Sequence, residues 1–275
     1  MAVTSFSGKV AAITGAGSGM GQWLAILLSR AGCEVAVADV NEAGLQETVS
    51  QLADGVRHSV HVVDMADQQA VESFAAAVIS EHQQVHMIFN NAGVSVTGSV
   101  EQMPYEDMRW LMDINFWGVI YGCKSFLPHL QQVSEAAIIN TSSIFGTVAV
   151  PSQSIYNASK FAVRGYTYAL RQELKDTHIG VSCVQPGGVK TNIVNKSRYR
   201  PMDNQSASKE EMAVQFQQIA RLSSEQAAQI ILEGVLRDKA RILVGNDARL
   251  LTWLERLLPL RYMKVLNRLR ERNGL

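Results

Sequence analysis

The sequence lacks an excess of either charge, a long apolar run and a cysteine framework. Lysine plus arginine number 25, as do aspartate plus glutamate, so the composition does not indicate the basic face that nucleic-acid binding needs. No run reaches the roughly 18 apolar residues of a membrane-spanning helix. Cys33, Cys123 and Cys183 lie in apolar segments without the spacing of a metal site or a disulfide framework. We interpret them as reduced core residues, and we expect no metal site.

The first residues do not resemble a secretory signal. Lys9 is followed by only a short apolar run, Val10 to Ile13, and then by glycines. A signal peptide carries a longer apolar stretch and a small-residue cleavage site. We therefore expect a cytoplasmic protein.

Seven short apolar runs alternate with segments of helical periodicity. The first six runs are continuous rather than alternating, which is typical of strands buried on both faces of a parallel sheet. No Pro- or Ser-rich linker interrupts the alternation, so residues 1–248 are predicted to form one doubly wound α/β domain of the Rossmann type, with helices on both faces. The predicted strands are Val10–Thr14, Val35–Ala38, Val60–Val63, Met87–Asn90, Ala137–Thr141, Val181–Gln185 and Ile242–Gly245, and the predicted helices are Met20–Ala31, Glu42–Leu52, Gln68–His82, Tyr105–Leu130, Ile155–Asp176 and Ser224–Leu236.

A glycine-rich turn follows the first predicted strand. Glycines permit tight turns and let the backbone approach a pyrophosphate closely, and the next helix offers its N-terminal N–H groups to the anion. The spacing is Gly15-x3-Gly19-x-Gly21, with Met20 in the third glycine position of the usual dinucleotide fingerprint. Although an ordinary structural turn is the alternative, the position after a buried strand favours cofactor binding. The candidates in this turn are Gly15, Gly17, Ser18, Gly19, Met20 and Gly21.

Asp39 ends the second predicted strand, 24 positions after Gly15. An acidic residue about 20 residues beyond the glycines binds the ribose hydroxyls of NAD and repels the 2′-phosphate of NADP. Neither Val40 nor Ala16 supplies the basic side chain that a 2′-phosphate needs. Asp39 could instead cap a helix, but Asn41 can serve that purpose. NAD is therefore expected rather than NADP.

Two further polar patches follow predicted strand ends, where ligands bind in such sheets. Asp64, with Met65 beside it, could accept a hydrogen bond from the adenine amino group. Asn91, Ala92 and Gly93 follow the fourth strand and could line the adenosine ribose, with an ordinary Asn/Gly turn as the alternative.

Tyr156 and Lys160 are four residues apart in a helical pattern, so they share one helix face. A tyrosine titrates near pH 10, too high for a general base at neutrality, and a nearby ammonium should lower that pKa. Ser143 ends the fifth strand, where a hydroxyl could donate to a substrate oxygen. Asn115 is a polar amide in an apolar neighbourhood and needs a partner. It could bind Lys160 through a water.

The ordered set of these motifs resembles the short-chain dehydrogenase/reductase family, in its short single-domain branch, over about residues 5–248. The resemblance implies a seven-stranded sheet and a homodimer or homotetramer built on the two long helices. It also implies that Ser143 polarises the substrate, that Tyr156 is the acid/base, that Lys160 binds the nicotinamide ribose and that Asn115 holds a relay water. Near the nicotinamide it places the segment with Pro186, Gly187, Val189 and Thr191.

The predicted function is NAD-dependent hydride transfer between the nicotinamide and a secondary alcohol or ketone. The alternatives are a catalytically inactive dinucleotide-sensing or scaffold protein of the same fold, and an epimerase or dehydratase. An apolar substrate is expected, because the candidate pocket residues are mostly apolar. These are Ile144, Phe145, Val148, Val150, Ile193 and Val194.

Two segments fall outside the alternation. Residues 191–222 are polar and follow Pro186-Gly187-Gly188, which makes them a candidate substrate lid. Residues 249–275 form an amphipathic helical extension that Pro259 should break or kink. From Arg249 to Arg272 this extension carries seven basic and two acidic residues. Its apolar side could pack on protein and roof the substrate pocket, or it could contact an anionic membrane surface.

Overall fold

In the computed structural model, seven parallel strands form one sheet, and the described residues are 2–191, 193, 197–200, 211, 214, 220–259, 261–265 and 268. The strand order is β11-β7-β6-β4-β1-β2-β3, which confirms the predicted doubly wound architecture. Val194 and most of the predicted lid, 191–222, lie outside the described residues. The strands are β1 (Val10–Thr14), β2 (Glu34–Asp39), β3 (His58–Val62), β4 (Met87–Asn90), β6 (Ala136–Thr141), β7 (Ile179–Pro186) and β11 (Arg241–Val244).

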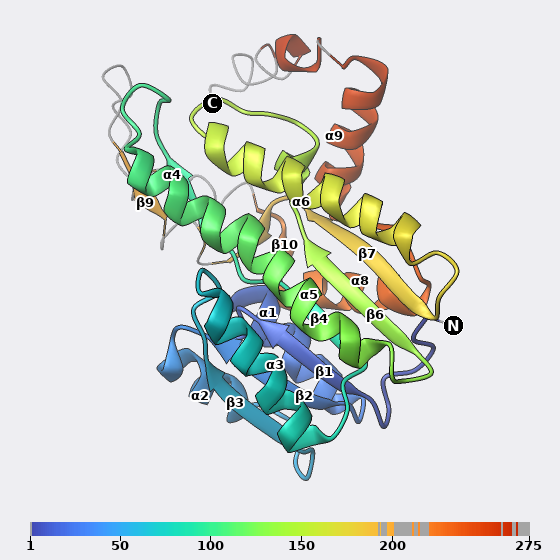
Figure 1. Cartoon of the computed structure of the whole chain (residues 1–275). Helices are drawn as coiled ribbons and strands as arrows, with labels where there is room; N and C mark the ends of the chain where they lie inside the picture. Colours follow the sequence, from blue (N-terminus) through green and yellow to red (C-terminus); the bar gives the residue numbers. More distant parts are fainter. Residues whose placement is uncertain are drawn as a thin grey trace.

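Helices cover both faces of this sheet (Figure 1). Alternate residues of a strand point to opposite faces, so Ile13 of β1 packs in one apolar core while its neighbour Ala12 packs in the other. Residues of α1 (Gly19–Arg30), α2 (Glu42–Val49) and α8 (Ser224–Leu236) complete the first core. Residues of α3 (Gln68–His82), α5 (Gly118–Leu130) and α6 (Ser154–Glu173) complete the second.

One strand departs from the predicted burial. The run at Val60–Val63 was expected to be covered on both faces, and for β3 this is wrong. It is one of the two edge strands of the sheet, at the other end of the strand order from β11, and Val62 is 60% exposed. A continuous apolar run indicates a strand, but only the strand order shows which strands lie at the edges and lack a neighbour on one side.

The long helical pattern at Tyr105–Leu130 contains a change of helix type. It begins as α4 (Tyr105–Met112), continues as a π-helical turn, η1 (Asp113–Trp117), and resumes as α5. A π turn inserts an extra residue and rotates the side chains that follow it, and such turns are frequent at functional sites. Asn115 lies inside this turn and is fully buried.

Two short parallel strand pairs extend the structure beyond the carboxyl edge of the main sheet. β8 (Val189–Lys190) pairs with β10 (Leu222–Ser223), and β5 (Val96–Thr97) pairs with β9 (Arg198–Tyr199). Asp107 of α4 is buried and accepts hydrogen bonds from Arg198 Nη1 at 2.8 Å and Arg200 Nε at 2.6 Å. These bonds hold the pKa of Asp107 below its usual value and fasten the described end of the predicted lid to α4.

The C-terminal helix α9 (Asn246–Leu257) begins three residues before the predicted extension. Its inner residues Ala248, Leu251 and Leu254 pack with Ile144 and Val148 in a separate apolar cluster. Past the helix, the Tyr262 hydroxyl accepts a hydrogen bond from the Ala149 N–H at 2.9 Å. The described part of the extension therefore packs on its own chain. In the part of the chain that the structure describes, no helix is long and apolar enough to cross a membrane.

Candidate active site

The predicted phosphate-binding turn has the backbone that its glycines require. Gly15 has a φ of 68° and Gly19 a φ of 61°, in the left-handed region that favours glycine. A side chain on Gly21 would collide with the Gly15 carbonyl oxygen and with the Asn91 side-chain amide. Gly21 therefore lets α1 approach the turn closely, so the helix N-terminus faces the space beyond β1.

Asp39 is held at the end of β2 by the backbone. Its Oδ2 accepts the Gly17 N–H at 3.0 Å, and its Oδ1 accepts the Asn41 N–H at 3.0 Å. Each carboxylate oxygen keeps a further lone pair. The carboxylate is thus fixed in position while it can still accept hydrogen bonds from a diol.

A cavity of about 240 Å³ lies along the carboxyl ends of β1, β2 and β4. It brings together predicted residues from distant parts of the chain, and none of its described lining residues is arginine or lysine. The lining residues that were predicted for the cofactor are Gly15, Ser18, Gly19, Met20, Asp39, Asp64, Met65, Asn91, Ala92, Gly93 and Thr191. Sequence reasoning did not assign Val40, Asn41, Val63, Val94, Ile114 or Ile193 to the cofactor.

Asn91 ties the β4 end to the glycine turn. Its N–H and that of Ala92 donate to the Thr14 hydroxyl at 3.0 and 3.1 Å, and its side-chain amide donates to the Thr14 carbonyl at 3.1 Å. Its Oδ1 is buried at the cavity and has no partner among the described residues. An unpartnered buried acceptor costs free energy unless a ligand satisfies it. This atom and the glycine turn therefore fit a bound dinucleotide.

Several predicted cofactor residues do not line this cavity. Gly17 donates its N–H to Asp39, and Gly21 lies against the Gly15 carbonyl oxygen, so both shape the turn without lining the cavity. Val189 is buried in the core beneath the sheet edge. The Asp247 carboxylate occupies the space that a side chain on Gly187 would need, and it accepts the Gly188 N–H at 2.6 Å. Pro186 is the buried last residue of β7, so this segment can contribute mainly backbone.

Tyr156 and Ser143 meet at the start of α6. Ser143 precedes the short 3-10 helix η2 (Ile144–Gly146), and its hydroxyl accepts the Phe145 N–H at 3.1 Å. The Ser143 hydroxyl lies close enough to the Tyr156 hydroxyl to act on its pKa. The structure thus places the two hydroxyls together, although they are thirteen residues apart in the sequence.

The predicted lowering of the Tyr156 pKa is wrong for the protein alone. Burial raises the pKa of Tyr156, and the nearby Ser143 hydroxyl opposes that rise only in part. The phenolate loses more hydration here than its described surroundings replace.

Lys160 is buried and carries its amine toward the same site. Its Nζ lies 5.8 Å from the centroid of the Tyr156 ring and donates to the Thr141 carbonyl at 3.0 Å. Burial lowers the pKa of Lys160 to about 8. Lys160 is 3% exposed and has no carboxylate partner among the described residues. Burying an ammonium group in this way is costly, which is typical of a functional group.

Asn115 is held in place by the backbone of Val94. Its Oδ1 accepts the Val94 N–H at 2.8 Å, and its amide donates to the Val94 carbonyl at 2.9 Å. A side chain on Gly93 would come within 3.4 Å of both Asn115 Oδ1 and Lys160 Nζ. Gly93 and Asn115 thus set the spacing between the cavity wall and the lysine.

Ser142 is a positioning residue that sequence reasoning did not single out. Its hydroxyl donates to the Lys160 carbonyl at 2.7 Å, and a side chain on Gly146 would collide with Ser142 Oγ. These contacts hold the turn after β6 against α6, and so they fix the position of Ser143 relative to Tyr156. The Thr-Ser-Ser sequence marks the strand end, but nothing in it distinguishes the serine that faces the helix backbone.

The predicted substrate-side residues separate into two groups. Ile144 and Val148 pack with α9, and Phe145 lies edge-on to Tyr156 with ring centroids 6.2 Å apart. Ile193 lines the cofactor-side cavity instead. Ile144 and Phe145 are therefore the predicted apolar residues that directly follow Ser143, in η2.

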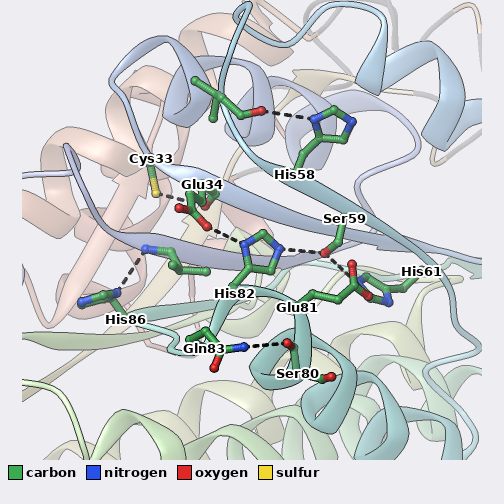
Figure 2. A network of polar contacts seen from close by, with 12 residues as sticks. Cys33, Glu34, His58, Ser59, His61, Ser80, Glu81, His82, Gln83 and His86 are labelled. Carbon is green, nitrogen blue, oxygen red and sulfur yellow. Dashed lines mark hydrogen bonds and ion pairs between the residues drawn. The ribbon is translucent and has the colours of Figure 1, made fainter.

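A second polar network lies at the opposite, amino edge of the sheet (Figure 2). Glu34 Oε2 is 2.7 Å from His82 Nδ1, and His82 Nε2 is 2.9 Å from Ser59 Oγ. His61 Nε2 approaches the same hydroxyl at 2.7 Å. Sequence reasoning missed this cluster, because its members come from β2, β3 and the end of α3 without a shared motif.

Comparison with known proteins points to one family. The short chain dehydrogenase family model matches residues 9–201. The chain is 40% identical over 267 residues to SadH of Mycobacterium tuberculosis, an oxidoreductase by name, covering 96% of this chain and 95% of that protein. It is 30% identical to the cyclohexanol dehydrogenase of an Acinetobacter strain, with 88% of this chain and 93% of that protein covered.

A solved structure resembles the whole fold. A short-chain dehydrogenase/reductase from Burkholderia phymatum, in complex with NAD, superposes with a TM-score of 0.83 at 31% identity. The superposition covers 93% of this chain and 95% of that one.

Proposed function

The chain belongs to the short-chain dehydrogenase/reductase family, and within that family we propose that it is an NAD-dependent enzyme acting on secondary alcohols or ketones. The observation that carries the proposal is the grouping of the half-buried Tyr156 with the buried Ser143 and Lys160. Gly93 joins this group to the cavity that Asp39 lines. The NAD-bound relative and the alcohol dehydrogenase among the similar proteins support the same cofactor and reaction class.

The residues of the cavity would hold the cofactor. The glycine turn would face its pyrophosphate, and Asp39 would accept hydrogen bonds from the adenosine ribose. Asp64 and Asn91 would bind the adenosine end, while Thr191, with the backbone of residues 186–189, would lie near the nicotinamide. When bound, NAD supplies the acceptor for the substrate hydride. A 2′-phosphate would meet the Asp39 carboxylate, and the described lining residues offer no basic side chain to compensate, which favours NAD over NADP.

Tyr156 would exchange the proton on the substrate oxygen. In carbonyl reduction its hydroxyl donates that proton, and the raised pKa keeps it protonated at neutral pH. In alcohol oxidation it must accept a proton as the phenolate, so oxidation should accelerate as pH rises. Ser143 would donate a hydrogen bond to the substrate oxygen as charge develops. The Lys160 ammonium would stabilise the phenolate.

An apolar substrate is part of the proposal. Ile144, Phe145 and Val148 surround the Ser143 side of the site, and α9 closes over two of them. We further propose that the enzyme is a homodimer or homotetramer that uses α5 and α6. Trp117, the last residue of η1 and adjacent to α5, is 44% exposed and stacks on the half-buried Tyr121 of α5. An aromatic pair with one exposed ring is typical of an interface.

Tyr156→Phe tests the function directly. We expect turnover of a secondary alcohol with NAD to fall by at least about 10²-fold, because the variant lacks the proton-transfer hydroxyl. NADH binding, followed by fluorescence titration, should be retained. Tyr168→Phe, on the same helix and partly exposed, is the matched control. Turnover within about tenfold of the parent would overturn the role of Tyr156.

The test also separates the enzyme from an inactive dinucleotide-sensing protein. That alternative predicts NADH binding by the parent chain without turnover in either direction. The substrate panel should contain aliphatic, alicyclic and steroidal alcohols, with the matching ketones and NADH for the reverse reaction.

A further inference from the structure

The outer face of α9 exposes large apolar side chains. Leu250, Trp253 and Leu257 are 63%, 61% and 55% exposed. They recur at intervals of three and four residues, so they form one stripe along the helix. The inner face of the same helix is already buried against Ile144 and Val148. This stripe is therefore the part of the helix surface that stays exposed to solvent when the inner face packs on the chain.

Basic residues flank the stripe on one side. At about 100° per residue, Trp253 lies at the centre of the exposed arc, Leu250 and Leu257 on one side of it, and Arg249 and Arg256 on the other. Both arginines are exposed. Beyond the helix, Arg261, Lys264 and Arg268 are exposed as well. Glu255 is the only acidic residue from 249 to 268.

From this arrangement we propose that the outer face of α9 docks on an anionic lipid surface. Tryptophan and leucine would enter the boundary between headgroups and acyl chains, and the arginines would meet the lipid phosphates. The positive charge of this face favours an anionic lipid surface over a second copy of the chain as its binding partner. An antiparallel two-fold contact centred on Trp253 would place Arg249 of one copy near Arg256 of the other, and like charges across an interface oppose association.

The helix is formed before it meets the lipid. Its inner side is packed, and Tyr262 is hydrogen-bonded to the backbone of Ala149. An isolated helix of this length is marginal in water and would have to fold as it binds. Here the protein core has already ordered it, so binding need not supply that ordering free energy.

Docking would also select substrate, a consequence that rests on the proposed function. The inner side of α9 covers the apolar cluster beside Ser143, so a docked enzyme would hold its substrate side next to the lipid. The substrates would then be alcohols or ketones that partition into membranes.

The test is flotation of the full-length chain with vesicles. One set contains equal parts of phosphatidylglycerol and phosphatidylcholine, and the other contains phosphatidylcholine alone. We expect the protein to float with the anionic vesicles at low salt and to be released as salt rises. Trp253→Gln and the pair Arg249→Gln/Arg256→Gln should each weaken binding on the order of tenfold.

Matched controls lie far from α9. Val62→Gln removes an equally exposed apolar side chain from β3, which lies at the other end of the strand order from β11. Arg57→Gln/Lys175→Gln removes two exposed charges. Both should bind like the parent. The proposal is overturned if the parent does not float with anionic vesicles, or if the α9 variants bind as the controls do. It is also overturned if Trp253→Gln changes the oligomer mass, because the face would then belong to a second copy.

The substrate consequence has its own measurement. Anionic vesicles should raise turnover of a long-chain secondary alcohol and leave that of a short, water-soluble one unchanged. Flotation without any turnover would contradict the proposed function while leaving the docking intact.

Discussion

Two polar clusters at opposite edges of one sheet differ in what they leave unsatisfied. At the amino edge, Glu34, His82 and Ser59 are aligned like an acid–base–nucleophile triad, and both ring nitrogens of His82 have partners (Figure 2). At the carboxyl edge, the part of the chain that the structure describes supplies no partner for Asn91 Oδ1 and no carboxylate for the buried Lys160. The first cluster satisfies itself, whereas the second has polar groups available to ligands.

The comparison shows that hydrogen-bond geometry alone does not identify a site. Ser59 and His82 are 5% and 4% exposed, and His61 takes a further position beside the serine hydroxyl. A nucleophile needs access to a substrate and a donor for the developing oxyanion. The active-site cluster instead adjoins a cavity at strand carboxyl ends, where ligands bind in doubly wound sheets.

The largest expected difference between the two clusters is in how turnover responds to replacing Ser143 or Ser59. Ser143→Ala should reduce turnover about 10²–10³-fold, because it removes a donor to the substrate oxygen. Ser59→Ala should leave turnover unchanged and lower the free energy of unfolding instead. Steady-state kinetics and chemical denaturation of both variants provide the measurement. A loss of turnover in Ser59→Ala with normal stability would make the amino-edge cluster catalytic and break the comparison.

Lys160→Met tests whether burial of the Lys160 ammonium destabilises the folded chain. The pKa of Lys160 falls from 10.5 to about 8 in the folded chain. Between these values the unfolded chain binds more protons, so the parent should gain stability as pH rises through that window. The gain relative to Lys160→Met should approach about 3 kcal/mol. Denaturant titrations from pH 7 to 10.5 measure it, and parallel curves for the two proteins would contradict the burial argument.

His82→Leu tests the structural role of the second cluster. The change leaves the Ser59 hydroxyl and the Glu34 carboxylate without their shared partner, so we expect a loss of about 1–3 kcal/mol of stability. Turnover and NADH affinity should match the parent below the melting transition. If thermal unfolding is unaffected, the network does not stabilise the fold in the way described.

Asp39→Ser tests how the candidate site discriminates between NAD and NADP, and it should have the smallest free-energy effect of the four tests. Removing the carboxylate should weaken NAD use and relieve the repulsion of a 2′-phosphate. We expect the ratio of kcat/KM for NADP over NAD to rise on the order of tenfold, which corresponds to about 1.4 kcal/mol. Asp54→Ser, an exposed carboxylate in the turn before β3, is the charge-matched control. A parent that already prefers NADPH would show that Asp39 has been misread.

Much of the candidate site could be located in the sequence, because the features that mark it are local. The glycine turn needs particular backbone angles after a buried strand, and a spacing of four residues places Tyr156 and Lys160 on one helix face. Asp39 and Asp64 could be placed because parallel strands end at a common edge. The sequence did not predict the Asn115 contacts, because they join the π-helical turn to the backbone of Val94, 21 residues earlier in the chain.

The amino-acid sequence by itself therefore determined the alternation of strands and helices, the turn at Gly15–Gly21 and the helix face that carries Tyr156. Each depends on a periodicity or a backbone requirement that operates over a few residues. Only the tertiary structure decided that β3 is an exposed edge and that Glu34 meets His82. It also decided that α9 buries one face against Ile144 and leaves Trp253 exposed. These outcomes depend on neighbours distant in the chain, and burial is fixed only when those neighbours pack.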